Sequence, residues 1–407
     1  MSLSDINLNE VSISETRVMN LKGKPIELYK YDVSFVKTNR HFLDINLPNI
    51  KYLYLPKSMT HFIKDNQVDS LQFIEDDNRG AISQYESVDI DSTKFYLSVK
   101  GIGSTTHPFS RRLFDNNEIE TLSGIHLGER SIPFHSETGP RYMTGELWLR
   151  GSPYGGQGLE HATISLRASE MADVTSINGF RIAPVVNIIY LPEELESTIK
   201  RIYWYRRFPG KMVQEVRLVP SNVRIFFHSG STLGGNVAAV FDMFNIDTEE
   251  KAYNFLGNFV RSGISFLTLF VRSLKSYDDG TLGGYDFYDV WLDKDAVLAP
   301  DGTIYFVDLE GLQWMRIREE DLAEKIDDQI YRSLYEFMYA YEQIEQERVR
   351  RFGNRTDRKI QFEHLLREGM RDDRIVDLER DGETINLVIG NILNEQRLIK
   401  KFPIIDR

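Results

Sequence analysis

The chain contains no cysteine, which excludes disulfides, thiol nucleophiles and thiolate metal ligands. A bound metal would therefore need oxygen or histidine ligands. Long apolar runs are also missing: the longest, Ile264–Val271, is interrupted by Ser265 and Thr268 and is far shorter than the roughly 20 residues that span a bilayer. The N-terminal residues MSLSDINLNEVSISE lack the basic start and apolar block of a signal peptide. These absences predict a cytoplasmic protein with no membrane partner.

Positive charge is in short supply as well. The 49 basic residues face 61 acidic ones, which leaves a formal net charge of −12. Nucleic acids and anionic membranes are bound by clustered lysine and arginine, so this balance argues against a nucleic-acid partner. The remaining composition is globular, with 41% hydrophobic and 12% aromatic residues. A length of 407 residues is enough for two or three domains with a sizeable core.

The N-terminal half is patterned for strands. Residues 1–75 contain short alternating or aromatic-rich segments separated by Pro, Asn and Gly, which predicts a β-rich region. A hairpin that ends in a lysine is predicted next, in the order turn, strand, turn, strand: Asn78–Ala81, Ile82–Val88, Asp89–Thr93 and Lys94–Lys100.

An irregular segment and a second β-rich stretch follow the hairpin. Residues 105–157 are rich in Gly, Pro, Ser and charge, which predicts a long irregular insertion that is either functional or mobile. A helix is expected at 159–173, followed by strands at 182–191 and 213–219. Together these elements predict a mostly antiparallel sheet with a helix beside it.

The C-terminal half is patterned for helices. Asp247–Glu250 has the form of a capping box, and apolar residues at helical spacing from Ala252 to Leu267 predict a core helix. Gly257 and Gly263 each weaken that helix by about 1 kcal/mol relative to alanine, so close packing is expected to compensate. The segment 319–350 repeats the pattern, and charged helices are expected to continue to about 396.

The most informative stretch is Thr303–Leu312, TIYFVDLEGL, which follows the turn sequence Ala299–Gly302. The order strand, tight turn, strand, acid is predicted here, with Asp308 at the tip of a buried strand. A carboxylate in that position can hold a divalent cation against a phosphate. The alternative is an aspartate that caps a turn or pairs with an arginine.

A lysine at a strand end, a glutamate on a following helix and acids around a strand-turn-strand form the layout of protein-kinase-like phosphotransferases. Between about 78 and 345 the chain resembles that superfamily, most clearly in TIYFVDLEGL, which is similar to the metal-binding strand end of kinases and aminoglycoside-phosphotransferase-like enzymes. The resemblance implies an α+β, two-lobed fold, with an antiparallel β-rich N-lobe and a mainly helical C-lobe. It also implies ATP and Mg²⁺ as cofactors. The expected domains are 1–75, 76–230 with the insertion, and 231–407.

The resemblance assigns roles to residues in the helical half. Asp308 would hold Mg²⁺, and Asp295, 13 residues earlier, stands where the family has a metal-binding asparagine. Asp286 and Asp289 are three residues apart in the expected catalytic loop, and one of them would act as the catalytic base that positions the acceptor hydroxyl. The stretch Gly284–Asp295 contains no histidine or asparagine, and an acid at position 295 adds negative charge beside the phosphates.

Three residues of the β-rich half complete the implied site. Lys100 would contact the α- and β-phosphates, and Glu170, with Glu160 as the alternative, would form an ion pair with it. Gly80 would let the preceding turn approach the phosphates, although a plain hairpin turn fits the same residues. A surface lysine at a strand end and solvated helical acids are the structural alternatives.

Three functions remain open at this point. The first is an ATP- and Mg²⁺-dependent phosphotransferase that acts on an unknown protein or small-molecule acceptor, with the nucleotide between the lobes; adenylyl transfer, as in selenoprotein-O-like enzymes, is a variant of it. The second is a catalytically inactive nucleotide-binding pseudokinase or interaction module, which the departures near Asp295 favour. The third is a structural or assembly protein in which the implied site residues lie in separate regions.

Overall fold

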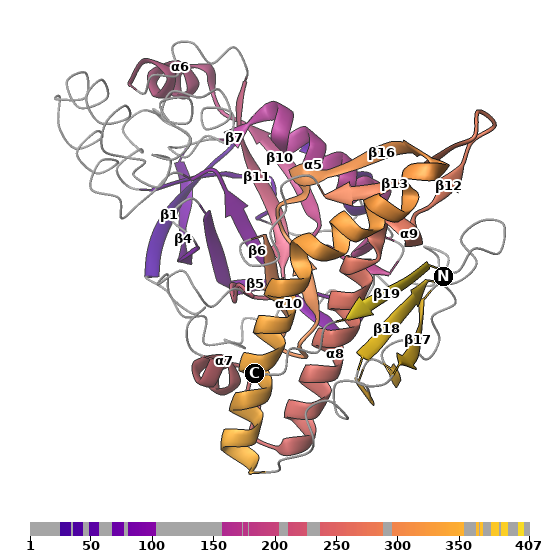
Figure 1. Ribbon diagram of the computed structural model, residues 1–407. Helices are drawn as coiled ribbons and strands as arrows, with labels where there is room; N and C mark the ends of the chain where they lie inside the picture. The colour runs from indigo at the N-terminus through magenta and orange to yellow at the C-terminus, as the bar shows by residue number, and fades with distance from the viewer. Residues whose placement is uncertain are drawn as a thin grey trace. The chain divides into compact units, whose positions relative to one another are not determined.

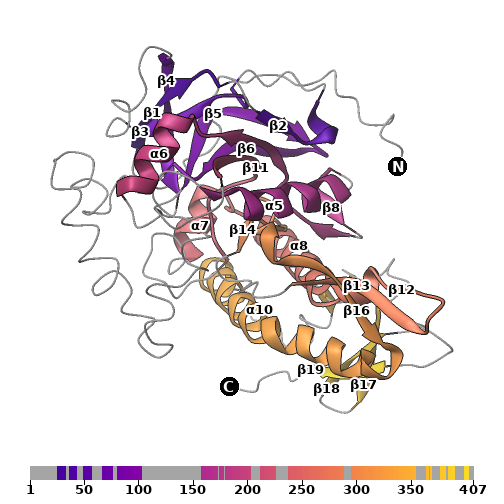
Figure 2. The same ribbon diagram turned by 90° about the horizontal axis from the view of Figure 1, so that it is seen from above.

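The computed structural model describes residues 25–33, 36–43, 49–56, 67–76, 80–102, 157–172, 174–177, 179–202, 211–225, 237–287, 295–353, 364–365, 367–368, 376–381, 384–389 and 398–402. They form two compact units: unit 1 contains residues 1–174 and 183–222, and unit 2 contains residues 175–182 and 223–407. Both units carry helices and antiparallel sheets, so the fold class is α+β (Figures 1 and 2).

Unit 1 is built on one large antiparallel sheet. Eight of its strands follow the order β2-β10-β11-β6-β5-β4-β1-β3, and β7 pairs with β11 as a ninth. The strands are β1 (Pro25–Tyr31), β2 (Val36–Thr38), β3 (Leu53–Pro56), β4 (Gln67–Asp76), β5 (Gly80–Ile90), β6 (Thr93–Lys100), β7 (Gln157–Gly158), β10 (Val185–Tyr190) and β11 (Met212–Val219). Because β4 extends to Asp76 and pairs with both β1 and β5, residues on either side of the expected boundary at 75 share one sheet.

The β5–β6 hairpin confirms the strand order predicted around Lys100. Ile90 pairs with Thr93, so the loop consists of Asp91 and Ser92 alone, and both have positive φ, at 48° and 64°. This is the backbone of a two-residue primed turn, whose twist matches that of the strands it joins. At the other end of the hairpin, Gly80 and Lys100 are directly opposite each other.

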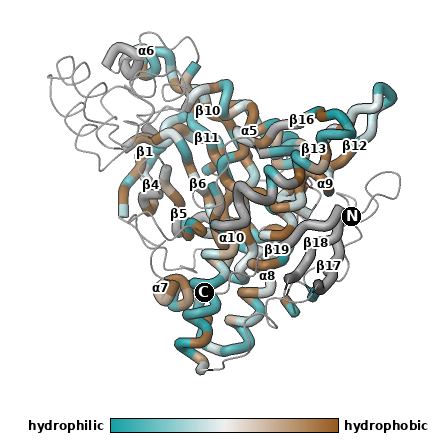
Figure 3. Tube along the Cα trace, viewed as in Figure 1, coloured by the Kyte–Doolittle hydropathy of each residue, from teal (hydrophilic) through white to brown (hydrophobic). Residues whose placement is uncertain are grey.

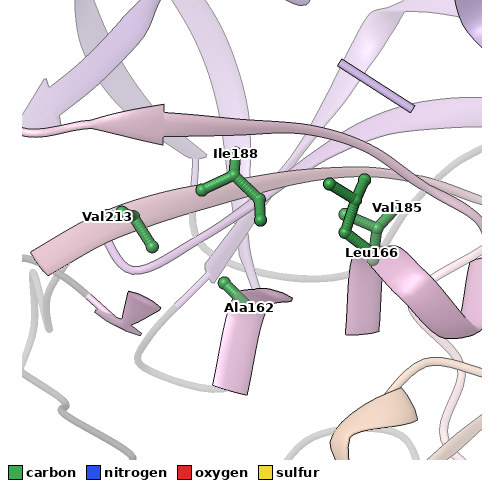
Figure 4. Packing of buried hydrophobic residues seen from close by; sticks show 5 residues of the cluster. All are labelled: Ala162, Leu166, Val185, Ile188 and Val213. Atoms are coloured by element: carbon green, nitrogen blue, oxygen red, sulfur yellow. The ribbon is translucent and has the colours of Figure 1, made fainter. Parts of the chain in front are cut away.

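Helix α5 (Leu159–Met171) covers part of this sheet, as the sequence predicted. Ala162 and Leu166 of the helix pack on three buried strand residues, Val185, Ile188 and Val213, in a fully buried cluster (Figure 4). The spacing of four residues places both helical side chains on one face. A second helix, α6 (Glu193–Ile202), follows β10.

Unit 2 is organised around two long helices. Its helices are α7 (Val237–Met243), α8 (Glu249–Leu267), α9 (Leu269–Arg272) and α10 (Leu322–Phe352), and 3-10 turns occur at Leu309–Gly311 and Glu319–Asp321. Helix α8 begins at the predicted place, where the Thr248 side chain accepts a hydrogen bond from the Lys251 N–H at 3.2 Å. A Cβ on Gly263 would lie 2.2 Å from the Phe337 ring, so the close packing expected to compensate for this glycine is confirmed.

The strands of unit 2 form four small antiparallel sheets. They are β8 (Ser176–Ile177) with β9 (Phe180–Arg181); β12 (Lys275–Ser276), β13 (Thr281–Phe287) and β16 (Leu312–Arg318); β14 (Ala296–Leu298) with β15 (Ile304–Phe306); and β17 (Val376–Asp381), β18 (Thr384–Ile389) and β19 (Leu398–Phe402). The expectation that charged helices continue to about 396 was wrong, because β17 and β18 lie within that range and pair across six positions.

Candidate functional site

The candidate site lies at the open end of the β14–β15 hairpin in unit 2. Its turn is closed by two backbone hydrogen bonds, from the Ala299 N–H to the Thr303 carbonyl at 2.8 Å and from the Gly302 N–H to the Ala299 carbonyl at 2.9 Å. The Asp301 carboxylate accepts bonds from both the N–H and the hydroxyl of Thr303, at 2.9 and 3.0 Å. These are local interactions of turn-forming residues, which is why the sequence indicated them.

Gly302 is needed at this turn for two reasons. Its φ is +92°, a conformation that side chains rarely adopt. In addition, a Cβ at this position would lie 2.1 Å from the Phe255 carbonyl oxygen of α8. The turn is therefore held directly against the helix, and the register of the two strands is determined by it.

The strand that leads to Asp308 is anchored in the core of unit 2. Phe306 is buried, and its ring centroid lies 4.4 Å from that of Phe266 and 4.6 Å from that of Phe180. The Ile304 N–H donates to the Ser262 hydroxyl of α8 at 3.0 Å. Asp308 lies two residues after the end of this strand, which gives its backbone a rigid support.

The hairpin brings the two predicted metal-binding acids to the same end. The Val307 N–H donates to the Asp295 carbonyl at 2.8 Å, so Asp308 follows the residue that is paired with Asp295. Asp295 is buried, whereas Asp308 is half-buried. Asp308 precedes the 3-10 turn at Leu309–Gly311, but its side chain makes no hydrogen bond that caps this turn. The turn-capping alternative for Asp308 is thereby weakened.

Two carboxylates are too few to fill the coordination shell of a metal ion, but they are enough for Mg²⁺ when other ligands complete the shell. Mg²⁺ is commonly held by one or two carboxylates, with phosphate and water oxygens completing its shell. Within the described residues, no group of three or more His, Asp or Glu side chains is arranged to hold a metal ion. Asp295 and Asp308 thus place two carboxylate-bearing residues at this end of the hairpin.

Asp286 has a different environment from the loop expected for a catalytic base. It is the sixth residue of strand β13, opposite Gln313 of β16, and its side chain is 1% exposed. Its carboxylate forms an ion pair with the Lys325 ammonium of α10, which is itself 10% exposed. The expectation of a loop at 286 is corrected by this strand, and Asp286 is a partner in a buried ion pair. Asp289, the alternative base, lies outside the described residues.

Lys100 and Gly80 are neighbours in unit 1. They occupy facing positions of β6 and β5, and Lys100 also faces Glu215 of β11 on its other side. Directly opposed residues of antiparallel strands project from the same face of the sheet. Glu215 is fully buried and pairs with Arg217, with 2.6 Å between the carboxylate and the guanidinium. The carboxylate nearest to Lys100 in sheet register is thus Glu215.

Glu170, the expected partner of Lys100, contacts another segment. Its carboxylate accepts a hydrogen bond from the Arg40 N–H at 3.4 Å, and its carbonyl accepts one from the Arg40 guanidinium. His41 Nε2 also lies 3.0 Å from that carbonyl. Basic groups at a helix C-terminus interact favourably with its free carbonyls, so Glu170 belongs to the end of α5. Glu160, the other alternative, is exposed on the first turn of the same helix.

Sequence reasoning missed two charged residues, Lys325 and Glu215. Lys325 lies in a helix whose charges alternate with apolar positions, and nothing local distinguishes it from a solvated lysine. Glu215 did leave a signal, because the polar run Gln214–Glu215 and Arg217 interrupt an otherwise apolar strand, and all three side chains are buried. Buried charges in a strand are retained only where they are paired.

A scan against models of protein families and a search of curated proteins find no match to this chain. Among the residues that the structure describes, no helix is long and apolar enough to cross a membrane.

Proposed function

We propose that the protein is a kinase-like phosphotransferase that uses ATP and Mg²⁺. The observation that supports this best is the β14–β15 hairpin, which holds Asp295 and Asp308 at one end on strands packed in the core of unit 2. These are the two positions that the resemblance to kinases assigns to the metal.

The proposed roles follow from the chemistry of each side chain. Magnesium, when bound, neutralises the phosphate charge as the phosphoryl group transfers. Asp308, half-buried at the strand end, offers carboxylate oxygens to the metal, and the buried Asp295 adds a second set. Lys100 projects from a rigid strand, so its ammonium can meet a phosphate oxygen with little loss of entropy.

A nucleotide-binding protein that transfers nothing is the second candidate. The burial of Asp286 in an ion pair with Lys325 favours it, because this acid is then occupied rather than available to a hydroxyl. In that case Asp295 and Asp308 would help to bind the nucleotide, and no phosphoryl group would be transferred to an acceptor.

Nucleotide binding is tested by thermal unfolding with ATP or ADP, each with and without MgCl₂. Ligand present at 100 times its Kd stabilises a protein by about 2.7 kcal/mol, so a rise of a few degrees in Tm is expected with Mg²⁺ and ATP together. Asp308→Asn removes the charge with little change of shape and should abolish the metal-dependent part. Glu324→Gln, an exposed acid of α10, is the matched control and should leave the shift unchanged.

Participation of unit 1 is tested by Lys100→Met, with the exposed Lys51→Met as control. Loss of the ATP shift in Lys100→Met alone supports the proposal, and an equal shift in both variants removes Lys100 from the site. Transfer of ³²P from γ-labelled ATP to protein or metabolites then separates an enzyme from a binding module. Absence of any thermal shift with nucleotide contradicts both candidates.

A further inference from the structure

The strands β12, β13 and β16 carry a second feature, an exposed face of rings and cations. Sheet register places these side chains on one face: Gly283 is opposite Arg316 and Lys275, and Tyr285 is opposite Trp314. Figures 1 and 2 show the three strands side by side. We call this surface the aromatic face and define it by Lys275, Tyr277, Tyr285, Trp314 and Arg316.

The rings of the aromatic face support one another. The Trp314 indole N–H donates to the Tyr277 hydroxyl at 3.0 Å, and the Tyr285 and Trp314 rings meet edge to face with centroids 4.8 Å apart. A Cβ on Gly283 would lie 2.7 Å from Trp314 Nε1 and 2.8 Å from a Tyr277 ring carbon. Gly283 thus lets the two rings close over the strand, which makes the face a fixed platform.

The other side of this sheet packs against the core of unit 2. The aromatic face is the side that points away from that core. Leu282 is buried, and Gly284 is so close to α9 that a Cβ there would lie 2.7 Å from the Phe270 carbonyl oxygen. Trp314 nevertheless remains 39% exposed. An exposed tryptophan held in place by its neighbours is typical of binding surfaces rather than of cores.

Cations already bind to this face from within the chain. The Arg316 guanidinium lies 4.0 Å from the Tyr277 ring centroid, and the Lys275 ammonium lies 5.5 Å from it. Arg316 is also held by the Asp279 carboxylate at 2.8 and 2.9 Å. The surface therefore shows, in its own contacts, that a ring and an acid can hold a guanidinium here.

Acidic charge exceeds basic charge around the aromatic face. The segments 275–281 and 312–321 carry five carboxylates and three cations. The end of the β12–β13 hairpin is accordingly hydrophilic (Figure 3). Arg318, the third cation, is paired with Glu320 at 2.6 Å and with Asp321 at 3.1 Å. Phosphate-bearing partners are disfavoured by this excess, and cationic ones are favoured.

We propose that the aromatic face binds an arginine-bearing segment of a partner protein. An incoming guanidinium stacks on the exposed Trp314 ring, as Arg316 stacks on Tyr277, and the excess carboxylates at the hairpin end complement its charge. Trp, Tyr and Arg are the residue types that dominate the energy of protein interfaces, and all three lie on this face. The proposal is independent of the nucleotide chemistry.

The test uses the full chain and two fluorescein-labelled nine-residue peptides, GRGRGRGRG and GEGEGEGEG, in fluorescence anisotropy at low and moderate salt. The arginine peptide is expected to bind, more weakly as salt rises, and the glutamate peptide is not. Trp314→Ala should weaken arginine-peptide binding ten-fold or more without changing net charge. Gly283→Ala displaces the rings without removing them and should weaken binding as well.

Met171→Ala is the matched control, because Met171 is another exposed apolar side chain, on α5 of unit 1, and binding should not change. Circular dichroism verifies that each variant is folded. If Trp314→Ala does not fold, Trp314→Tyr takes its place; because it keeps a ring, it should bind the arginine peptide more weakly than wild type but still measurably. Equal binding by wild type and Trp314→Ala overturns the proposal. So does failure of the arginine peptide to bind, and so does self-association in sedimentation that depends on Trp314, which would assign the face to a second copy of the chain.

Discussion

Removal of the Asp286 carboxylate should destabilise unit 2 strongly. In Asp286→Ala, the Lys325 ammonium keeps its place on α10 with a side chain that is only 10% exposed, and it loses the carboxylate with which it is paired. An uncompensated buried charge costs about 3–5 kcal/mol. Asp328 lies 3.9 Å from the same ammonium, but it is 51% exposed and contributes as a surface pair does, at most about 1 kcal/mol. We therefore expect a loss of about 3 kcal/mol.

Urea unfolding followed by far-ultraviolet circular dichroism measures this loss as a lower midpoint. The double variant Asp286→Leu/Lys325→Met replaces both charges with apolar groups and should return to within about 1 kcal/mol of wild type, because a buried ion pair is often no better than well-packed hydrophobic residues. Glu324→Ala, on the exposed side of α10, should change stability by about 0.5 kcal/mol at most. A loss of less than about 1 kcal/mol in Asp286→Ala would mean that the Asp286–Lys325 pair behaves as a solvent-exposed ion pair.

Three further predictions concern single positions. Gly302→Ala should cost about 3 kcal/mol or more in thermal unfolding, because a φ of +92° and a contact of 2.1 Å to the Phe255 carbonyl oxygen add together, whereas Gly280→Ala, at φ +75° in open space, should cost about 1 kcal/mol. Gly263→Ala should cost about 1–3 kcal/mol by overpacking against Phe337, and Phe337→Leu should restore part of that loss when the two changes are combined. Burial, with the Asp89 carboxylate adding to it, raises the pKa of Tyr96 from 10.0 to about 12. The folded state therefore holds the Tyr96 phenol proton more tightly than the unfolded state does. The resulting contribution to the free energy of unfolding is fully present below pH 10 and is lost as the pH rises from 10 to 12. Tyr96→Phe should flatten the dependence of Tm on pH in that interval, and an unchanged slope would contradict the assignment.

The parts of the fold that the sequence predicted are those determined by local interactions. The turn at Ala299–Gly302, the turn expected within Asp89–Thr93 and the helix start expected at Asp247–Glu250 each depend on residues within a few positions of one another. Such interactions leave a pattern in a short window. The hairpin that supports Asp308 was predictable for this reason.

The parts that were missed depend on distant partners. Lys325 and Asp286 are 39 positions apart, and no local pattern indicates their pairing. Gly283 and Gly284 lie in a strand where neighbouring side chains and backbone leave no room for a Cβ, and these neighbours are not adjacent in sequence. Strands β17 to β19 were not predicted, because their sequences are rich in charged residues. These segments form strands through pairing with one another rather than through the propensity of their residues.

The path of the chain has a consequence for dissecting the protein. Residues 175–182 belong to unit 2, although the residues before and after them in the sequence belong to unit 1. Phe180 of this segment packs its ring on those of Phe266 and Phe306. A C-terminal fragment that starts at 223 therefore lacks a piece of its own interior. During synthesis, this piece emerges long before the helices that receive it, so unit 2 completes its folding only after unit 1 has been translated. A cut at 222 leaves all of unit 1 in the N-terminal fragment, so the two fragments would need to be mixed to recover the core of unit 2.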